Sequence, residues 1–216
     1  MKQALIYLLF SALALTSCLK AMYHISKSDE KWLSTRNQGD IILFRSENEV
    51  DTMTIVKKSV ADQILPIASA IGDTTFHGTG SLHFTLKHRG STISGWVIVA
   101  KESDDRLRLS IRIGKRQFDV SDTRHVKYSA KQMGRTFFKD IIYVDSTNSE
   151  LFSYDEYTPR SFSWSKSKGL LQYVYPNGDT YTFYKRITHD SMSESNDKQT
   201  RFDRLLDEIK EIIDEF

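Results

Sequence analysis

The residues of this 216-residue chain that could carry out chemistry are its six histidines, its paired carboxylates and its many serines. No His-x-His or His-Glu-x-x-His spacing occurs, and such spacings bring zinc ligands together on one strand or helix. His83 and His88 are five residues apart, so a strand would place them on opposite faces. His77 lies between glycines, where we expect a loop. We therefore expect solvated or singly hydrogen-bonded histidines, with no metal site and no cofactor.

Three pairs of acidic residues are the candidates for general acid and base groups, namely Asp104-Asp105, Asp119 with Asp122, and Asp155-Glu156. A glycosidase needs two carboxyl groups about 5 to 9.5 Å apart, whereas adjacent residues on a strand point to opposite faces. Asp104-Asp105 lies between two strand-like runs and predicts a turn. The chain also has no Gly-x-Ser-x-Gly elbow and no phosphate-binding Gly-x-x-x-x-Gly-Lys loop. No catalytic residue is predicted, and we expect a protein that is not an enzyme.

Two other groups of side chains leave alternatives open. A set of basic residues forms either an anion-binding patch for lipid phosphates or acidic glycans, or a solvated strand face paired with acids on a neighbouring strand: Arg106, Arg108 and Arg112, with Lys115 and Arg116 in the adjoining turn. A set of aromatic residues either lines a ligand cavity or fills the core: Trp96, Phe137, Phe138, Phe162, Trp164, Tyr173 and Tyr175.

The composition excludes several classes of protein. With 39% hydrophobic and 27% charged residues and a single cysteine, the chain is not disordered, collagen-like or stapled by disulfides. Its 30 basic residues nearly balance 28 acidic ones, which gives no general attraction to nucleic acid, so we expect no nucleic-acid partner. Aromatic residues make up 12% of the chain and suit half-buried β surfaces.

Alternating hydrophobic and polar residues predict β-strands with one buried face. The clearest runs are Leu82 to Leu86 and Leu107 to Ile113, and Asn177-Gly178 predicts a hairpin with a type I′ turn. Short connections favour antiparallel meander order for about nine or ten strands. We therefore expect a mainly β protein with one antiparallel domain, either a single curved, barrel-like sheet or a β-sandwich.

Two stretches depart from this pattern. Residues 59–72 carry apolar side chains at helical spacing, although Pro66 interrupts them, and predict a short broken helix or a covering loop. Residues 197–216 predict a C-terminal amphipathic helix, since seven apolar side chains follow one face. It either docks on the β domain or enters a groove of a partner. The expected order is a signal peptide (1–17), a tether (18–37), the β domain (38–187), a linker (188–196) and this helix.

The beginning of the chain predicts export. Lys2 precedes the uncharged stretch Ala4 to Leu15, whose twelve residues reach only about 18 Å as a helix, too short for a bilayer core of about 30 Å. Leu15-Thr16-Ser17-Cys18 then resembles the lipobox of bacterial lipoproteins. The resemblance implies cleavage before Cys18 and lipidation of its thiol, with two or more acyl chains giving a stable membrane anchor. Leu19 after the cysteine implies, by the enterobacterial sorting rule, the outer membrane.

A second resemblance concerns the two ends of the β domain, which are similar to the opening and closing strands of lipoprotein domains common in Bacteroidetes. It rests on Trp32, Gly39-Asp40, Phe44, Ser46, Asp51-Thr52, residues 169–173, Asn177-Gly178 and Tyr181. It implies a small envelope β domain without an assigned activity. We therefore predict a lipid-anchored cell-envelope binding or assembly module, whose partner is an envelope protein or a small apolar ligand. The alternative is an envelope hydrolase acting on glycans or peptides. The sequence specifies no oligomeric state.

Overall fold

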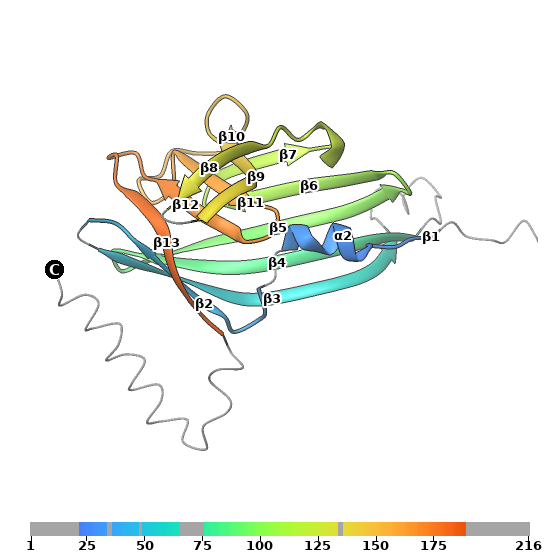
Figure 1. Ribbon diagram of the computed structural model, residues 1–216, viewed down its shortest axis with the longest axis horizontal. Helices are drawn as coiled ribbons and strands as arrows, with labels where there is room; N and C mark the ends of the chain where they lie inside the picture. The colour runs from blue at the N-terminus through green and yellow to red at the C-terminus, as the bar shows by residue number, and fades with distance from the viewer. Residues whose placement is uncertain (1–21, 34–35, 48, 65–75, 134–135, 189–216) are drawn as a thin grey trace, which may run out of the picture.

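The computed structural model describes residues 22–33, 36–47, 49–64, 76–133 and 136–188, and these residues form one large β-sheet (Figure 1). The strands are β1 (Met22–Tyr23), β2 (Ile41–Arg45), β3 (Val50–Ile64), β4 (Phe76–His88), β5 (Ser91–Ser103), β6 (Arg106–Ile113), β7 (Arg116–Val120), β8 (Ser129–Met133), β9 (Thr136–Val144), β10 (Glu150–Leu151), β11 (Ser161–Ser165), β12 (Gly169–Val174) and β13 (Thr180–Ile187). One short helix, α2 (Lys27–Glu30), and two 3-10 turns, η1 (Lys31–Leu33) and η2 (Thr123–His125), complete the described elements.

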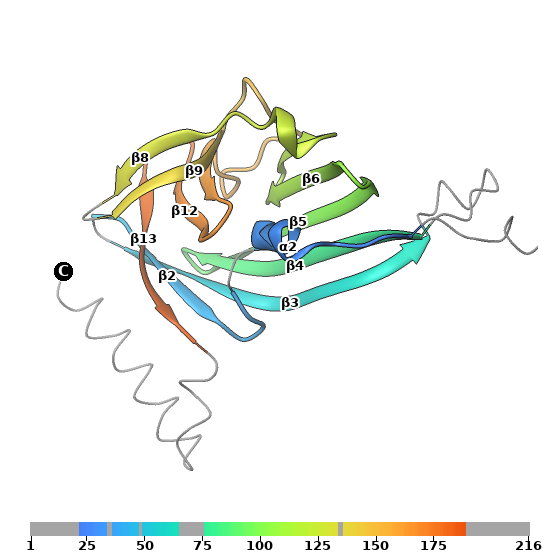
Figure 2. The same ribbon diagram turned by 45° about the vertical axis from the view of Figure 1, so that its right-hand side comes forward.

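The sheet consists of two antiparallel meanders joined through β2 and β13. Its strand order is β10-β7-β6-β5-β4-β3-β2-β13-β12-β11-β9-β8, and β1 pairs in parallel with β4. Figure 2 shows the sheet curling so that β8, β9 and β12 face β3, β4 and β5. Within the described residues the two ends of this path do not pair, so the sheet is curved and unclosed. The predicted single curved antiparallel sheet is confirmed, and the alternative of a sandwich of two sheets is wrong.

The strands form where the hydrophobic alternation predicted them. In β5 every second side chain from Ile93 to Val99 is buried and the residues between them are at least partly exposed, which is the pattern of a strand with one face on the core. The curled sheet encloses an interior in which aliphatic side chains pack with large aromatic ones. Four of the aromatic residues singled out above, Phe162, Trp164, Tyr173 and Tyr175, belong to this core, whereas Phe137 is 58% exposed.

The chain packs on the sheet earlier than predicted. β1 pairs with the start of β4, and Ser26 caps α2 through hydrogen bonds exchanged with Asp29. Trp32 and Leu33 follow and are fully buried in the core. Residues 22–33, which we predicted as part of the tether, therefore belong to the packed domain, because their apolar side chains cover the interior of the curved sheet.

Three local predictions are wrong. Residues 59–64 are not helical but continue β3, which pairs with β4 as far as Ile64 and Phe76; the long hairpin overrides the helical spacing. His77 lies in β4 and not in a loop. The described residues form thirteen strands where nine or ten were expected, partly because β1 and β10 have only two residues each and give no periodic signal.

The hairpin at Asn177-Gly178 is confirmed, but its turn is not of type I′. Gly178 has φ of 98°, whereas Asn177 keeps a negative φ, and Gly178 N–H donates to the Tyr175 carbonyl oxygen. Pro176 explains the difference, because its fixed φ suits the second position of a type I turn, which a left-handed glycine then follows. A type I′ turn does occur at Arg89-Gly90, where both φ angles are positive.

Several predictions concern residues outside the described ranges. These are the signal peptide, the lipobox with Cys18, residues 65–72 of the predicted broken helix, and the C-terminal helix at 197–216. Among the residues that the structure describes, no helix has both the length and the apolar character needed to cross a membrane.

Candidate ligand-binding site

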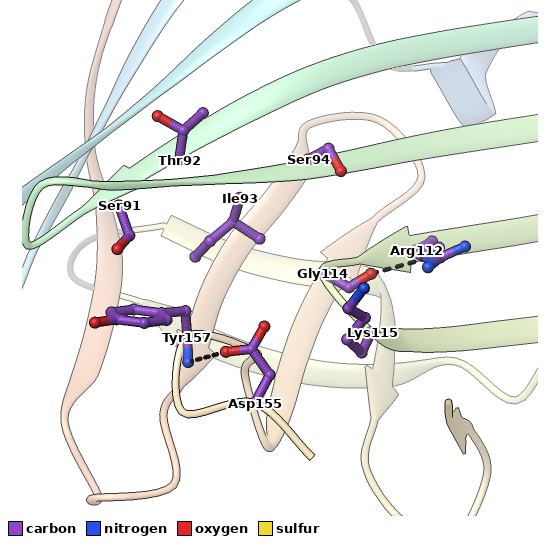
Figure 3. A pocket seen from close by; sticks show the side chains of 9 residues that line it. All are labelled: Ser91, Thr92, Ile93, Ser94, Arg112, Gly114, Lys115, Asp155 and Tyr157. Carbon is purple, nitrogen blue, oxygen red and sulfur yellow. Dashed lines mark hydrogen bonds between the residues drawn. The ribbon is translucent and has the colours of Figure 1, made fainter. Parts of the chain in front are cut away.

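A cavity of about 350 Å³ opens beside the first residues of β5 (Figure 3). We call it the β5 pocket. Its walls come from the start of β5, the end of β6 with the following turn, and the segment after β10: Ser91, Thr92, Ile93, Ser94, Arg112, Gly114, Lys115, Asp155 and Tyr157. Two cations, one carboxylate and several hydroxyl residues therefore line the pocket around Ile93, with Thr92 and Ser94 on the opposite face of β5 from Ser91 and Ile93. The volume lies in the lower part of the range of small-ligand sites.

The pocket exists because β6 is shorter than β5 at this end. Ile113 is the last residue of β6 and lies opposite Gly95, and the next N–H, of Gly114, donates to the Ser94 carbonyl oxygen at 2.9 Å. Residues 91–93 continue past this point. The N–H and C=O groups of alternate residues point to the same side of a strand. Because the Ser94 carbonyl points toward β6, the N–H and C=O of Thr92 also point to that side, where β6 no longer runs. In the described part of the chain, the pocket therefore contains a stretch of the β5 edge that β6 leaves uncovered.

The opposite wall is held in place by hydrogen bonds to the turn between β6 and β7. The Lys115 N–H donates to Thr158 Oγ1 at 3.0 Å. Arg116, predicted as a member of a surface patch, is buried, and it donates from Nε to the Pro159 carbonyl oxygen at 2.9 Å and from Nη1 to Ser149 Oγ at 2.8 Å. Asp155 and Tyr157 thus project from a fixed segment, and Figure 3 shows their side chains facing Ser91 and Ile93.

The two cations of the pocket are Arg112 and Lys115, and within the described part of the chain neither forms an ion pair. Other exposed arginines do: Arg106 pairs with Glu102 at 3.0 Å, and Arg124 pairs with Asp105 and Asp122. The predicted basic patch is therefore divided. Arg106 fits the solvated, paired alternative, whereas Arg112 and Lys115 line the pocket.

Arg112 and Asp155 are each oriented by a neighbour. Arg112 Nε donates to the Gly114 carbonyl oxygen at 2.8 Å, and its guanidinium carbon lies 5.2 Å from the centre of the Phe152 ring. Asp155 Oδ1 accepts the Tyr157 N–H at 2.9 Å. With two positive charges and one negative charge, the lining carries a net charge of +1.

A buried polar network lies in the adjoining part of the core. Asp51 and His88, only 2% and 3% exposed, are joined by His88 Nδ1, which is 3.0 Å and 3.1 Å from the two carboxylate oxygens. The Tyr173 hydroxyl donates to Asp51 Oδ2 at 2.6 Å. Burial, with the nearby Asp51 carboxylate, raises the pKa of the Tyr173 hydroxyl well above its usual value, so this group remains a donor.

Two more tyrosines enclose His88. The Tyr175 ring stacks on the imidazole with centres 4.0 Å apart, and the Tyr181 ring meets it edge-on. The Tyr181 hydroxyl donates to Glu49, which also accepts from Arg89 in the β4–β5 turn. These two donors lower the pKa of the Glu49 carboxyl, with Tyr181 contributing most.

The network and the pocket meet at His88. Ser91 is the cross-strand partner of His88, so the two side chains lie next to each other on the same face of the sheet. The buried Tyr175 hydroxyl has no hydrogen-bond partner among the described residues. Burial raises its pKa, and the charges of Asp51 and Asp155 raise it further, so Tyr175 is electrostatically coupled to the pocket wall.

Two predictions about individual residues, the faces of His83 and His88 and the turn at Asp104-Asp105, are confirmed. His83 and His88 do lie on opposite faces of β4, and Asp104-Asp105 does form a turn. The described residues contain no group of three or more metal-ligating side chains. Asp51 was named only within the resemblance to lipoprotein domains and not as a candidate site residue, although it lies one step beyond the Thr52–Lys87 pair and therefore opposite His88. The position of Asp51 opposite His88 in the β3–β4 hairpin is the feature from which its role could have been predicted.

Comparison with known proteins adds no constraint, because no family model, curated protein or solved structure matches the chain.

Proposed function

We propose that the protein is a lipid-anchored binding module of the cell envelope, held at the outer membrane through Cys18, whose ligand enters the β5 pocket. We propose that it is not an enzyme. The observation that carries the proposal is the pocket itself, where an edge of β5 that β6 leaves uncovered in the described structure, the side chains of Ser91, Asp155 and Tyr157, and two cations without an ion-pair partner among the described residues line one cavity. The interior of the sheet is filled by side chains, so the proposal concerns a polar ligand at the pocket in place of the apolar ligand first expected.

The first experiment tests the anchor. Cells producing the wild-type chain and the Cys18→Ala variant are fractionated, and the membranes are washed with alkaline carbonate. We expect the wild-type chain to stay with the membranes and the variant to appear in the soluble fraction, because the variant cannot receive the thioether-linked lipid. Retention of Cys18→Ala in washed membranes contradicts the proposed anchor.

The second experiment tests the pocket. Thermal unfolding of the full chain is followed with a panel of defined small ligands, comprising neutral sugars, sugar acids and dipeptides, in a detergent without a sugar headgroup. A ligand that binds the native state raises the melting temperature to an extent set by its concentration relative to Kd. We expect Lys115→Glu to abolish every such shift. The matched control is Lys57→Glu, since Lys57 is also exposed but lies on β3 outside the pocket. Stabilisation that survives Lys115→Glu unchanged places the binding site elsewhere.

A hydrolase is the second candidate, and one arrangement favours it. Asp51, His88 and Ser91 stand side by side on β3, β4 and β5, with the carboxylate on Nδ1 of the imidazole. An acid, a base and a hydroxyl nucleophile take this order in serine hydrolases. The described residues show no hydrogen bond from Ser91 to His88, and Asp51 is shared with Tyr173. The geometry therefore supports binding better than hydrolysis.

Labelling with a fluorophosphonate separates the two candidates. A nucleophilic Ser91 would displace fluoride and retain the phosphonyl group, which mass spectrometry of the peptide containing residues 91–94 would detect. We expect no label in the wild-type chain. A stoichiometric label that Ser91→Ala and His88→Gln both remove would establish the hydrolase and overturn the binding proposal.

A further inference from the structure

From the charges and hydrogen-bonding groups of the β5 pocket, we infer that its ligand is a single sugar unit that carries one carboxylate. This inference rests on the proposed function, since it names the ligand class of the same pocket. Three observations lead to it: the net charge of the lining, the mixture of donors and acceptors, and the size of the cavity.

The charge of the lining fits a monoanion. Lys115 and Arg112 supply two positive charges without ion-pair partners in the described structure, and Asp155 supplies one negative charge. One carboxylate on the ligand neutralises the remaining positive charge. A phosphate monoester carries close to two negative charges at neutral pH, and it would be placed beside the Asp155 carboxylate. A neutral ligand would leave both cations unpaired.

The hydrogen-bonding groups fit a ligand that is rich in hydroxyls. Ser91 and Tyr157 have hydroxyl groups that both donate and accept, and a hydroxyl on the ligand does the same. The N–H and C=O of Thr92, on the edge of β5 that β6 leaves uncovered in the described structure, add one fixed donor and one fixed acceptor. Within the described residues, the Asp155 carboxylate accepts one backbone N–H, from Tyr157, so it keeps further acceptor positions for ligand hydroxyls.

The size and the walls fit one sugar ring. A cavity of about 350 Å³ has room for a single ring. Figure 3 shows the Ile93 side chain pointing from β5 toward the segment that carries Asp155 and Tyr157, while the cations lie at the Gly114 side. Ile93 and the ring of Tyr157 are the apolar surfaces available to a sugar ring. A sugar acid has its carboxylate at one end of the ring and its hydroxyls around the remainder, which matches this separation.

Calorimetric titration with galacturonate and galactose tests the assignment, because the two sugars differ only in a carboxylate against a hydroxymethyl group at one carbon. The full chain is used in a detergent without a sugar headgroup. We expect galacturonate to bind with Kd of about 1 mM, as suits a ligand of this size. Galactose should bind at least about tenfold more weakly, as the loss of a charge-assisted hydrogen bond requires. Lys115→Gln should remove most of this preference, whereas Lys57→Gln should leave it intact.

Each contrary outcome has a separate meaning. Equal affinity for galactose and galacturonate overturns the acidic class but leaves the pocket as a sugar site. Tighter binding of galactose 1-phosphate than of galacturonate overturns the monoanion. Binding of alanyl-alanine but of neither sugar overturns the sugar assignment and retains the proposed function. If none of these ligands binds the pocket, the inference fails, and the ligand panel with Lys115→Glu then decides whether the proposed function fails with it.

Discussion

Removing the carboxylate of Asp51 should destabilise the protein more than removing any group that donates to it. Asp51 is 2% exposed and accepts hydrogen bonds from His88 Nδ1 at 3.0 Å and from the Tyr173 hydroxyl at 2.6 Å. Asp51→Ala leaves both donors buried without a partner. Because each buried donor left without an acceptor costs about 1 to 3 kcal/mol, we expect the two donors to lower the free energy of unfolding by about 2 to 6 kcal/mol.

Replacing Tyr173 by phenylalanine gives the matched comparison. Tyr173→Phe removes one donor and leaves Asp51 paired with His88, so it should cost about 1.5 to 3 kcal/mol, the usual value for a hydrogen bond to a charged group. The double variant should cost less than the sum of the two single variants, since a phenyl ring at this position needs no acceptor. The difference should lie between about 0.5 and 3 kcal/mol.

Urea unfolding followed by tryptophan fluorescence measures these values, because Trp32 and Trp164 are fully buried. The control is Asp105→Ala, since that carboxylate is 70% exposed and paired only at the surface, and a change within about 0.5 kcal/mol is expected. A loss below about 1 kcal/mol for Asp51→Ala, or strict additivity with Tyr173→Phe, would refute the reasoning.

Three other variants test particular contacts. Gly95→Ala should destabilise the protein by about 1 to 3 kcal/mol in urea unfolding, because its Cβ would lie 2.3 Å from ring atoms of Phe84; an unchanged midpoint contradicts this packing. Leu33→Ala should cost about 2 to 5 kcal/mol because Leu33 is fully buried, and a surface tether would predict no change. The Arg124 side chain and N–H lower the pKa of Asp122 from 3.8 to about 2. Because the folded-state pKa is the lower one, the contribution of Asp122 to stability should be complete above about pH 4 and be lost as the pH falls toward about 2. Asp122→Asn should remove that part of the pH dependence of the melting temperature. If the melting temperature of the variant falls with acid as the wild-type value does, the proposed role of Asp122 is wrong.

Much of the sheet could be predicted because alternation of hydrophobic residues reports directly which face of a strand is buried. The alternation in β4 even placed His88 on the face opposite His83. It does not report which strands are neighbours. Asp51 and Tyr173 are 122 residues apart and meet only because β2 pairs with β13, and nothing in either segment specifies that pairing.

The pocket escaped prediction for a related reason. It depends on where β6 stops relative to β5, and strand ends are set by the packing of the following turn and not by periodicity. Lys115 and Arg112 were recognised as part of a basic group, but the sequence could not separate them from Arg106, which has a partner in Glu102. The difference between a paired and an unpaired cation depends on neighbours across the sheet.

The β5 pocket is tested as the binding site most directly by mapping which residues a ligand contacts. Amide chemical shifts of the full chain are recorded while galacturonate is added, and the residues with the largest changes are located on the structure. We expect changes concentrated at residues 91–94, 112–115 and 155–157, with the same residues unaffected in Lys115→Glu. Changes centred on Trp32, Leu33 and the aromatic interior would show that the ligand enters the core of the sheet and would contradict the β5 pocket as the binding site.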